Sequence, residues 1–210
     1  MTELAGDHFF RRILAVGAHP DDIELGCFGT LARYRALGSE VAFLVLTWGG
    51  IGGSDATRQR EAEAAAGIIG AELIGGDLPD TAIPEGHPTI GIIEDAVARF
   101  RPTAVIVNSE ADTHQDHRAT ARAVISAARF VPALLFYQTP SSGRYFSPSV
   151  YVDITDHIEE KTRAVQIHTS QGENVYMADR AVKGLAEFLG LQVYQSGRYF
   201  EGFEIHQLLL

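Results

Sequence analysis

The sequence predicts an α/β fold with a mostly parallel sheet and helices on both faces. Apolar runs rich in β-branched residues alternate with stretches of helical periodicity, which is the order of βα units that build such a sheet. The chain has 210 residues, of which 46% are hydrophobic and 21% charged, so it can bury one ordinary core. We therefore expect a single Rossmann-like domain over residues 1–210.

Each expected element follows from a local pattern. Gly38 and Gly70 stand where glycines commonly end helices, and Pro102 separates a helix from the clearest buried strand. The expected strands are 12–18, 41–47, 73–74, 103–108, 133–138, 150–154 and 199–205. The expected helices are 25–37, 57–69, 88–100, 114–129, 155–169 and 178–189. Ligands bind at the carboxyl ends of strands in such sheets, so functional residues are sought there.

Composition excludes several classes of function. The 17 basic and 27 acidic residues give a formal charge of −10, which opposes binding to nucleic acid when no basic patch is present. The longest apolar run, around residues 41–46, is too short to cross a membrane, and residues 1–12 lack a signal-peptide pattern. We expect a cytoplasmic protein with no membrane partner. Because Cys27 is the sole cysteine, His, Asp or Glu must hold any metal.

Titratable residues follow the first expected strand directly. His19, Asp21 and Asp22 lie between that strand and the helix that begins near Leu25. Imidazole and carboxylate groups suit Zn²⁺. Alternatively, the two aspartates only cap the helix, because acidic residues are favourable at a helix N-terminus. The aspartates alone leave both interpretations open.

A second cluster follows the strand expected at 103–108. It contains His114, Asp116 and His117. Residues three apart at the start of a helix project in neighbouring directions, and Asp116 is placed to orient a ring. Two histidines and an aspartate within four residues, at a strand end that matches the first cluster, favour a metal or acid-base site over a structural role.

The two clusters together offer more ligands than a catalytic zinc needs. Such a zinc usually has three protein ligands and one water, whose pKa falls towards about 7. His19, Asp22 and His117 can supply the ligands, which leaves Asp21 and His114 as an acid-base pair. Spacing alone does not decide which histidine is the ligand.

These motifs resemble those of the PIG-L (LmbE-like) N-acetylglucosaminyl deacetylases. The resemblance is strongest in residues 18–24 (AHPDDIE), with the segment that follows to residue 32, and in residues 114–117 (HQDH). Weaker likenesses are an Arg-x-x-Glu element at 58–61, a Lys…His-x-Ser-Gln element at 161–171 and the closing segment 199–204. The resemblance extends over nearly the whole chain.

The resemblance implies a zinc-dependent hydrolase that removes an acetyl group from a small-molecule N-acetyl amino sugar or its conjugate. The zinc ligands that it implies are His19, Asp22 and His117. It implies that Asp21 is the general base for the zinc-bound water, and that His114 stabilises the oxyanion or protonates the leaving amine. Asp116 would orient an imidazole, and Arg58 would help to bind the substrate. Other divalent metals in place of the one zinc per chain, and assembly into a homo-oligomer, stay open.

Two alternative functions are weighed against this one. A metal-dependent phosphoesterase typically uses two metal ions, further carboxylates and cationic groups. A non-catalytic module that binds a sugar or nucleotide through a metal needs no base, whereas Asp21 and His114 are both present. The glycines at 49–53 lack the spacing of a nucleotide loop, so we expect them to form a rim of the pocket.

Overall fold

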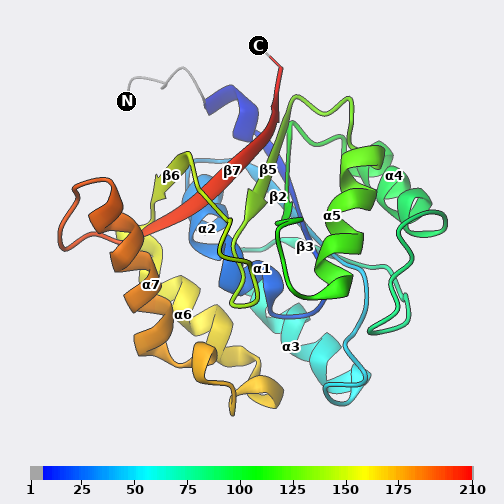
Figure 1. Ribbon diagram of the computed structural model, residues 1–210, viewed down its shortest axis with the longest axis horizontal. Coiled ribbons are helices and arrows are strands. Elements are labelled where there is room, and N and C mark those ends of the chain that lie inside the picture. The colour runs from blue at the N-terminus through cyan, green and yellow to red at the C-terminus, as the bar shows by residue number, and fades with distance from the viewer. Residues whose placement is uncertain (1–6, 210) are drawn as a thin grey trace.

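The computed structural model describes residues 7–209, and within them the chain builds one seven-stranded sheet (Figure 1). The strand order is β3-β2-β1-β4-β5-β7-β6. The first five strands are parallel, and β7 pairs antiparallel with both β5 and β6. The strands are β1 (Arg12–Gly17), β2 (Glu40–Val45), β3 (Glu72–Gly75), β4 (Ala104–Asn108), β5 (Ala133–Tyr137), β6 (Val150–Asp153) and β7 (Phe200–Leu208). The predicted, mostly parallel sheet is confirmed.

Helices cover both faces of the sheet because alternate side chains of each strand point in opposite directions. Leu14 and Val16 of β1 pack with the helices of one face, and Ile13 and Ala15 pack with those of the other. The first face carries α4 (Thr89–Phe100) and α5 (Gln115–Ala127). The second carries α1 (Asp22–Gly26), α2 (Phe28–Ala36), α3 (Asp55–Ile68) and α6 (Ile158–Ile167), and α7 (Asp179–Gln192) packs beside β7.

The helix expected at 25–37 is the main error in the predicted elements. It begins earlier, at Asp22, and divides into α1 and α2 at Cys27, whose φ of −145° is not helical. The Glu201 carboxylate accepts hydrogen bonds from the backbone amides of Gly29 and Thr30 at the start of α2, so a distant side chain stabilises the second helix start. Elsewhere Gly38 and the glycine at position 70 have positive φ after their helices, as predicted.

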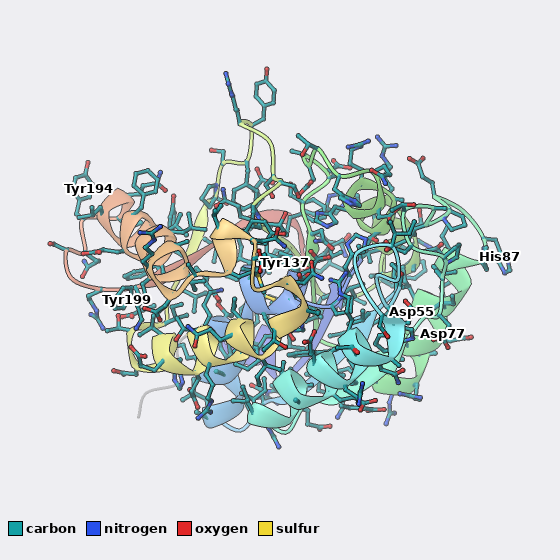
Figure 2. All side chains as sticks on the ribbon, turned by 90° about the horizontal axis from the view of Figure 1, so that it is seen from below. Asp55, Asp77, His87, Tyr137, Tyr194 and Tyr199 are labelled. Carbon is teal, nitrogen blue, oxygen red and sulfur yellow. The ribbon has the colours of Figure 1, made fainter. Side chains whose placement is uncertain are left out.

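A close contact between α1 and β5 explains one glycine in the first motif. A Cβ atom on Gly26 would lie 2.1 Å from the Tyr137 ring, so a side chain there would displace the tyrosine. The hydroxyl of Tyr137 donates to the carbonyl of Val16 at 2.9 Å. Figure 2 shows Tyr137 near the middle of the molecule, with His87 and Tyr194 at opposite ends. This packing holds α1 against the carboxyl end of the sheet.

A buried ion pair joins four elements behind α1. Lys161 of α6 and Glu201 of β7 are each 3% exposed, and Lys161 Nζ lies 2.5 Å from the carboxylate. The ammonium also donates to the carbonyls of Glu24 and Leu25 at the end of α1. Beside them, His168 is buried with Nε2 3.3 Å from the Glu24 carboxylate. Every donor of the ammonium therefore has an acceptor.

In the described part of the chain, no helix is both long and apolar enough to span a bilayer. Residues 1–6 lie outside the described part, and they belong to the segment 1–12 in which the sequence shows no signal-peptide pattern. Cys27 is completely buried and unpaired, as expected of a small core residue.

Replacing Lys161 by Met should destabilise the fold strongly. The substitution leaves the Glu201 carboxylate buried without its cation, which costs about 3–5 kcal/mol. The control is Arg122→Met, which removes the exposed ion pair between Arg122 and Glu85 and should cost about 1 kcal/mol or less. Urea unfolding measures both losses. Equal losses in the two variants would contradict the stabilising role of the buried pair.

Candidate functional site

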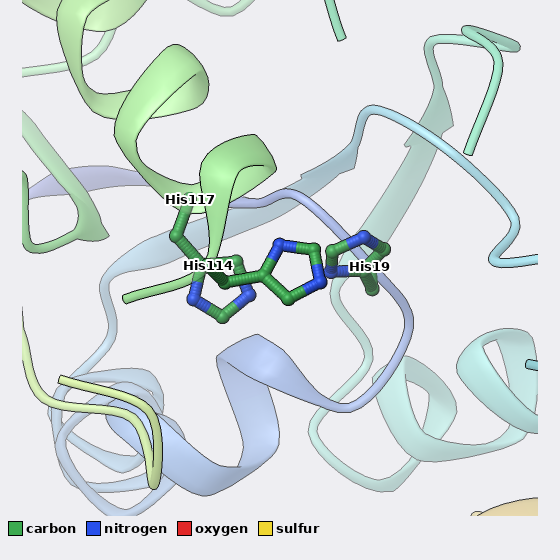
Figure 3. A group of neighbouring side chains, drawn as sticks. All are labelled: His19, His114 and His117. Atoms are coloured by element: carbon green, nitrogen blue, oxygen red, sulfur yellow. The ribbon is translucent and has the colours of Figure 1, made fainter. Parts of the chain in front are cut away.

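The two predicted clusters meet at the carboxyl ends of β1 and β4. These strands are parallel neighbours, and the strand order reverses between them, because β2 and β3 lie on the other side of β1. Figure 3 shows His19, from the loop after β1, beside His114 and His117 at the start of α5. Their ring centroids are 4.7–5.4 Å apart, and each offers a ring nitrogen within 4.8 Å of the others. This is the crevice in which open α/β sheets bind ligands.

Asp22 lies between two of these imidazoles. Its carboxylate oxygens are 3.5 Å from Nδ1 of His19 and 3.2 Å from Nε2 of His117. The same carboxylate accepts the backbone amide of His19 at 2.9 Å. Asp21 occupies the N-cap position of α1, but its side chain makes no capping hydrogen bond. The structure thus brings the three proposed ligands together.

The electrostatics of the site favour a bound cation. Burial opposes the charged form of both imidazoles, but the neighbouring carboxylates outweigh it and raise the pKa of His19 to about 9 and that of His117 to about 10. Burial likewise opposes ionisation of Asp22, yet the charge of His117 holds its pKa well below the usual range. Imidazole nitrogens and carboxylate oxygens are a donor set that fits Zn²⁺ or a related divalent metal, and such a metal can replace the protons on the rings.

Each of the two imidazoles beside Asp22 has a second carboxylate at its other nitrogen. Asp116 lies 3.1 Å from Nε2 of His19, and Asp112 lies 3.1 Å from Nδ1 of His117. Asp116 is therefore placed to orient an imidazole, as predicted, and that imidazole belongs to His19, which is 97 positions away in the chain. Outer carboxylates of this kind fix the orientation of ligating histidines.

His19, Asp80 and Asp116 form another group whose ligand atoms lie close enough to share an ion. Asp116 already accepts the backbone amides of Thr81 and Ile83, and Asp80 accepts that of Ile51. Asp116 thus accepts two backbone amides, one at each carboxylate oxygen, whereas Asp22 accepts one. The position beside Asp22 is therefore the better candidate.

Asp21 is held in an unusual backbone conformation beside the ligands. Its φ is 101°, a region that costs most side chains about 1–3 kcal/mol. Burial and the charge of Asp22 raise its pKa to about 7, while Arg58 opposes the increase from 3.5 Å away. The Arg58 guanidinium also donates to the carbonyls of Pro20 and Gly49. Arg58 therefore braces the loop that carries Asp21, and its contact with a substrate stays a prediction.

His114 is placed to donate a hydrogen bond. Its Nδ1 accepts the backbone amide of Asp116 at 3.2 Å, so the neutral ring carries its proton on Nε2. Burial and the nearby charge of His117 lower its pKa, which favours that neutral form.

A cleft of about 460 Å³ is lined by the predicted site residues His19, Asp21, Asp22, Arg58, His114 and His117. Ile51 and Gly52 line it, which agrees with a rim formed by the glycine-rich loop. Sequence reasoning missed four residues of the site and its surroundings: Asp80, Asp112, Thr139 and Tyr176. Asp112 and Thr139 follow the carboxyl ends of β4 and β5, so the rule about strand ends could have found them. Asp80 follows the short strand β3 in the same way, whereas Tyr176 lies in the 3-10 helix Val175–Met177, which carries no such signal.

Known proteins are similar to this chain in sequence and in fold. Residues 14–128 match the family model described as GlcNAc-PI de-N-acetylase (PIG-L). The "uncharacterized deacetylase YaiS" of Escherichia coli K12 is 36% identical over 167 residues, which cover 75% of this chain and 90% of the relative. Diacetylchitobiose deacetylase of Thermococcus kodakarensis is 28% identical over 187 residues, with 77% and 70% covered.

A protein of known crystal structure is also similar to this chain, both in fold and in sequence. The conserved protein TT1542 from Thermus thermophilus has 31% identity and a TM-score of 0.82, with 94% of this chain and 95% of that chain covered. The family model matches more than half of this chain, and relatives in that family are named deacetylases, which supports an enzyme of the hydrolase class. This chain belongs to the GlcNAc-PI de-N-acetylase (PIG-L) family.

Proposed function

We propose that the protein is a zinc-dependent hydrolase that removes the acetyl group from a small N-acetylated amino sugar or its conjugate. The observation that carries this proposal is the position of Asp22 between two imidazoles, with the Asp21 carboxylate beside it in the same cleft. The deacetylase names of the relatives support the reaction class.

His19, Asp22 and His117 would hold the metal ion. A divalent ion bound there would supply Lewis acidity, which lowers the pKa of a water molecule and polarises a carbonyl group. Asp112 and Asp116 keep the two rings in their orientations through the nitrogens that face away from Asp22.

Asp21 acts as the general base. A base works best when its pKa is near the working pH, and burial with the Asp22 charge raises the pKa of Asp21 to about 7. Arg58 fixes the position of the base through the Pro20 carbonyl and the Asp21 carboxylate. The proton of the attacking water passes to Asp21, which can later deliver it towards the leaving amine.

His114 stabilises the negative charge that develops on the acetyl oxygen. Its Nε2–H is free of the backbone contact that occupies Nδ1, and the residue lines the cleft. Oriented donors of this kind stabilise the transition state more than the ground state.

The lining of the cleft argues against a phosphoesterase. Among the described residues that line it, Arg58 carries the fixed positive charge, and its two terminal nitrogens already contact Gly49, Pro20 and Asp21. Several carboxylates face the same space, so a phosphate dianion would depend on the bound metal ion for its attraction, whereas a phosphoesterase typically adds a second metal ion and further cationic groups. An uncharged amide and sugar hydroxyls fit this lining better.

The enzyme should release acetate from one or more members of a panel of N-acetyl amino sugars when it is loaded with Zn²⁺. Asp21→Asn should lower kcat/KM by about 100-fold or more, because the amide cannot accept the proton. Asparagine tolerates positive φ, so the variant should keep its fold, which circular dichroism checks. Chelator treatment is the second control. Full activity in the folded Asp21→Asn variant would refute the assigned base.

His114→Ala should lower kcat by about 100-fold or more, with a smaller effect on KM, because the lost hydrogen bond forms mainly in the transition state. His114→Gln keeps an N–H donor and should recover part of kcat. Steady-state kinetics on the best substrate of the panel measures both variants. Equal kcat values for the two variants would show that hydrogen-bond donation is not the role of His114.

Asp112→Ala should weaken zinc binding by about 10-fold to 100-fold, because His117 then loses the partner of its outer nitrogen. Competition with a chromophoric chelator measures the affinity. The control is Glu110→Ala, which removes an exposed carboxylate from the same loop and should leave the affinity unchanged. A loss of the same size in both variants would point to general charge rather than to orientation of His117.

A further inference from the structure

A second cavity of about 270 Å³ adjoins the cleft. The two share the wall residues Leu25, Thr139, Pro140 and Tyr176. From this shared wall the second cavity extends between residues of α7, β7 and α6. These three elements lie at the edge of the sheet where β6 is found (Figure 1). The two cavities are therefore immediate neighbours.

The second cavity is chemically unlike the cleft. Its wall away from the cleft is built by the apolar side chains of Val182, Leu185, Ala186, Leu189 and Phe200. The charged residues among the described residues that line it are Lys161 and Glu201, which are paired with each other. Glu201 also accepts two amides of α2, and Lys161 also donates to two carbonyls of α1. Their polar atoms are therefore not available to a ligand.

The uncharged polar residues of the lining are Gln138, Thr139 and Tyr176. A sugar ring would therefore find few partners in this cavity for hydroxyl groups that leave water and need new hydrogen bonds. An alkyl or aryl group would gain, since burial of apolar surface is favourable and loses no hydrogen bonds. The volume is sufficient, because a dry protein cavity of about 150 Å³ lined by Leu, Ile and Phe binds benzene.

We propose that this cavity is a subsite for an alkyl or aryl substituent of the substrate. The proposal deepens the proposed deacetylase function and rests on it, because it takes the reacting amide to lie in the cleft. The substituent is either an N-acyl chain longer than acetyl or an apolar group on the sugar, in the position of an aglycone. In both cases one substrate molecule occupies both cavities, with its polar sugar in the cleft and its apolar group between α7 and β7.

Binding of alkyl glucosides tests the subsite without any need for catalysis. Each buried methylene adds up to about fourfold in affinity, so the five further methylenes of hexyl glucoside set an upper limit of about 1000-fold over methyl glucoside. Binding costs reduce this gain, and we expect hexyl glucoside to bind at least about tenfold more tightly than methyl glucoside. Ala181→Phe, which places a ring in the cavity from the start of α7, should abolish this difference. Glu187→Phe introduces the same ring on an exposed position of α7 outside the lining and should preserve it.

A second pair of variants covers the case in which Ala181→Phe fails to fold. Leu185 is 40% exposed and lines the cavity, whereas Leu191 is 53% exposed on the same helix and does not. Leu185→Ala should reduce the preference for hexyl glucoside several-fold, and Leu191→Ala should not. Equal binding of the two glucosides by the unaltered protein, or an unchanged preference in both cavity variants, would overturn the proposal.

Two substrate series identify the source of the apolar group. One extends the acyl group of N-acyl glucosamine from acetyl to hexanoyl, and the other extends the glycoside of N-acetylglucosamine from methyl to hexyl. The series whose kcat/KM rises with chain length, and loses that rise in Ala181→Phe, contains the group that enters the cavity. A flat response in both series would contradict the subsite. If no deacetylation occurs but the binding preference persists, the proposed function fails while the apolar site stands.

Discussion

The parallel pairing of β1 with β4 is the constraint on which the site depends. Two motifs that lie almost a hundred positions apart in the chain each follow one of these strands. Because the two strands end at the same edge of the sheet, the side chains of the motifs contact each other, as His19 and Asp116 do. The chain first builds β2 and β3 on one side of β1 and then returns to place β4 on the other. This reversal opens the crevice that His19, Asp22 and His117 occupy.

Burial of so many ionisable groups is tolerable because charges of opposite sign alternate through the site. Asp116, His19, Asp22, His117 and Asp112 follow one another with contacts of 3.1–3.5 Å. Asp21 departs from this pattern. It has the left-handed backbone, and burial with a like charge raises its pKa rather than lowering it. Local strain and a displaced pKa in one side chain are typical of a position kept for chemistry instead of stability.

The buried pair of Lys161 and Glu201 links stability to the shape of the site. It holds the end of α1 and the start of α2, and α1 begins with Asp22. The same two side chains form part of the wall of the apolar cavity. Because their hydrogen bonds are directed at α1 and α2, the charged groups support the helix that begins with Asp22 and leave the cavity to apolar contacts.

The sequence by itself determined the fold class, the order of the strands and helices and the membership of the two clusters, because periodicity, helix-ending glycines and strand-end motifs are local signals. Tertiary structure alone decided that Asp116 faces His19, that Asp80 reaches the site and that a cavity opens beside α7. It also decided the break at Cys27, since the carboxylate that stabilises the start of α2 comes from β7. Such contacts join segments that are far apart in the chain, and the pairing of the strands decides which of them become neighbours. The local spacing of residues in the sequence does not contain that information.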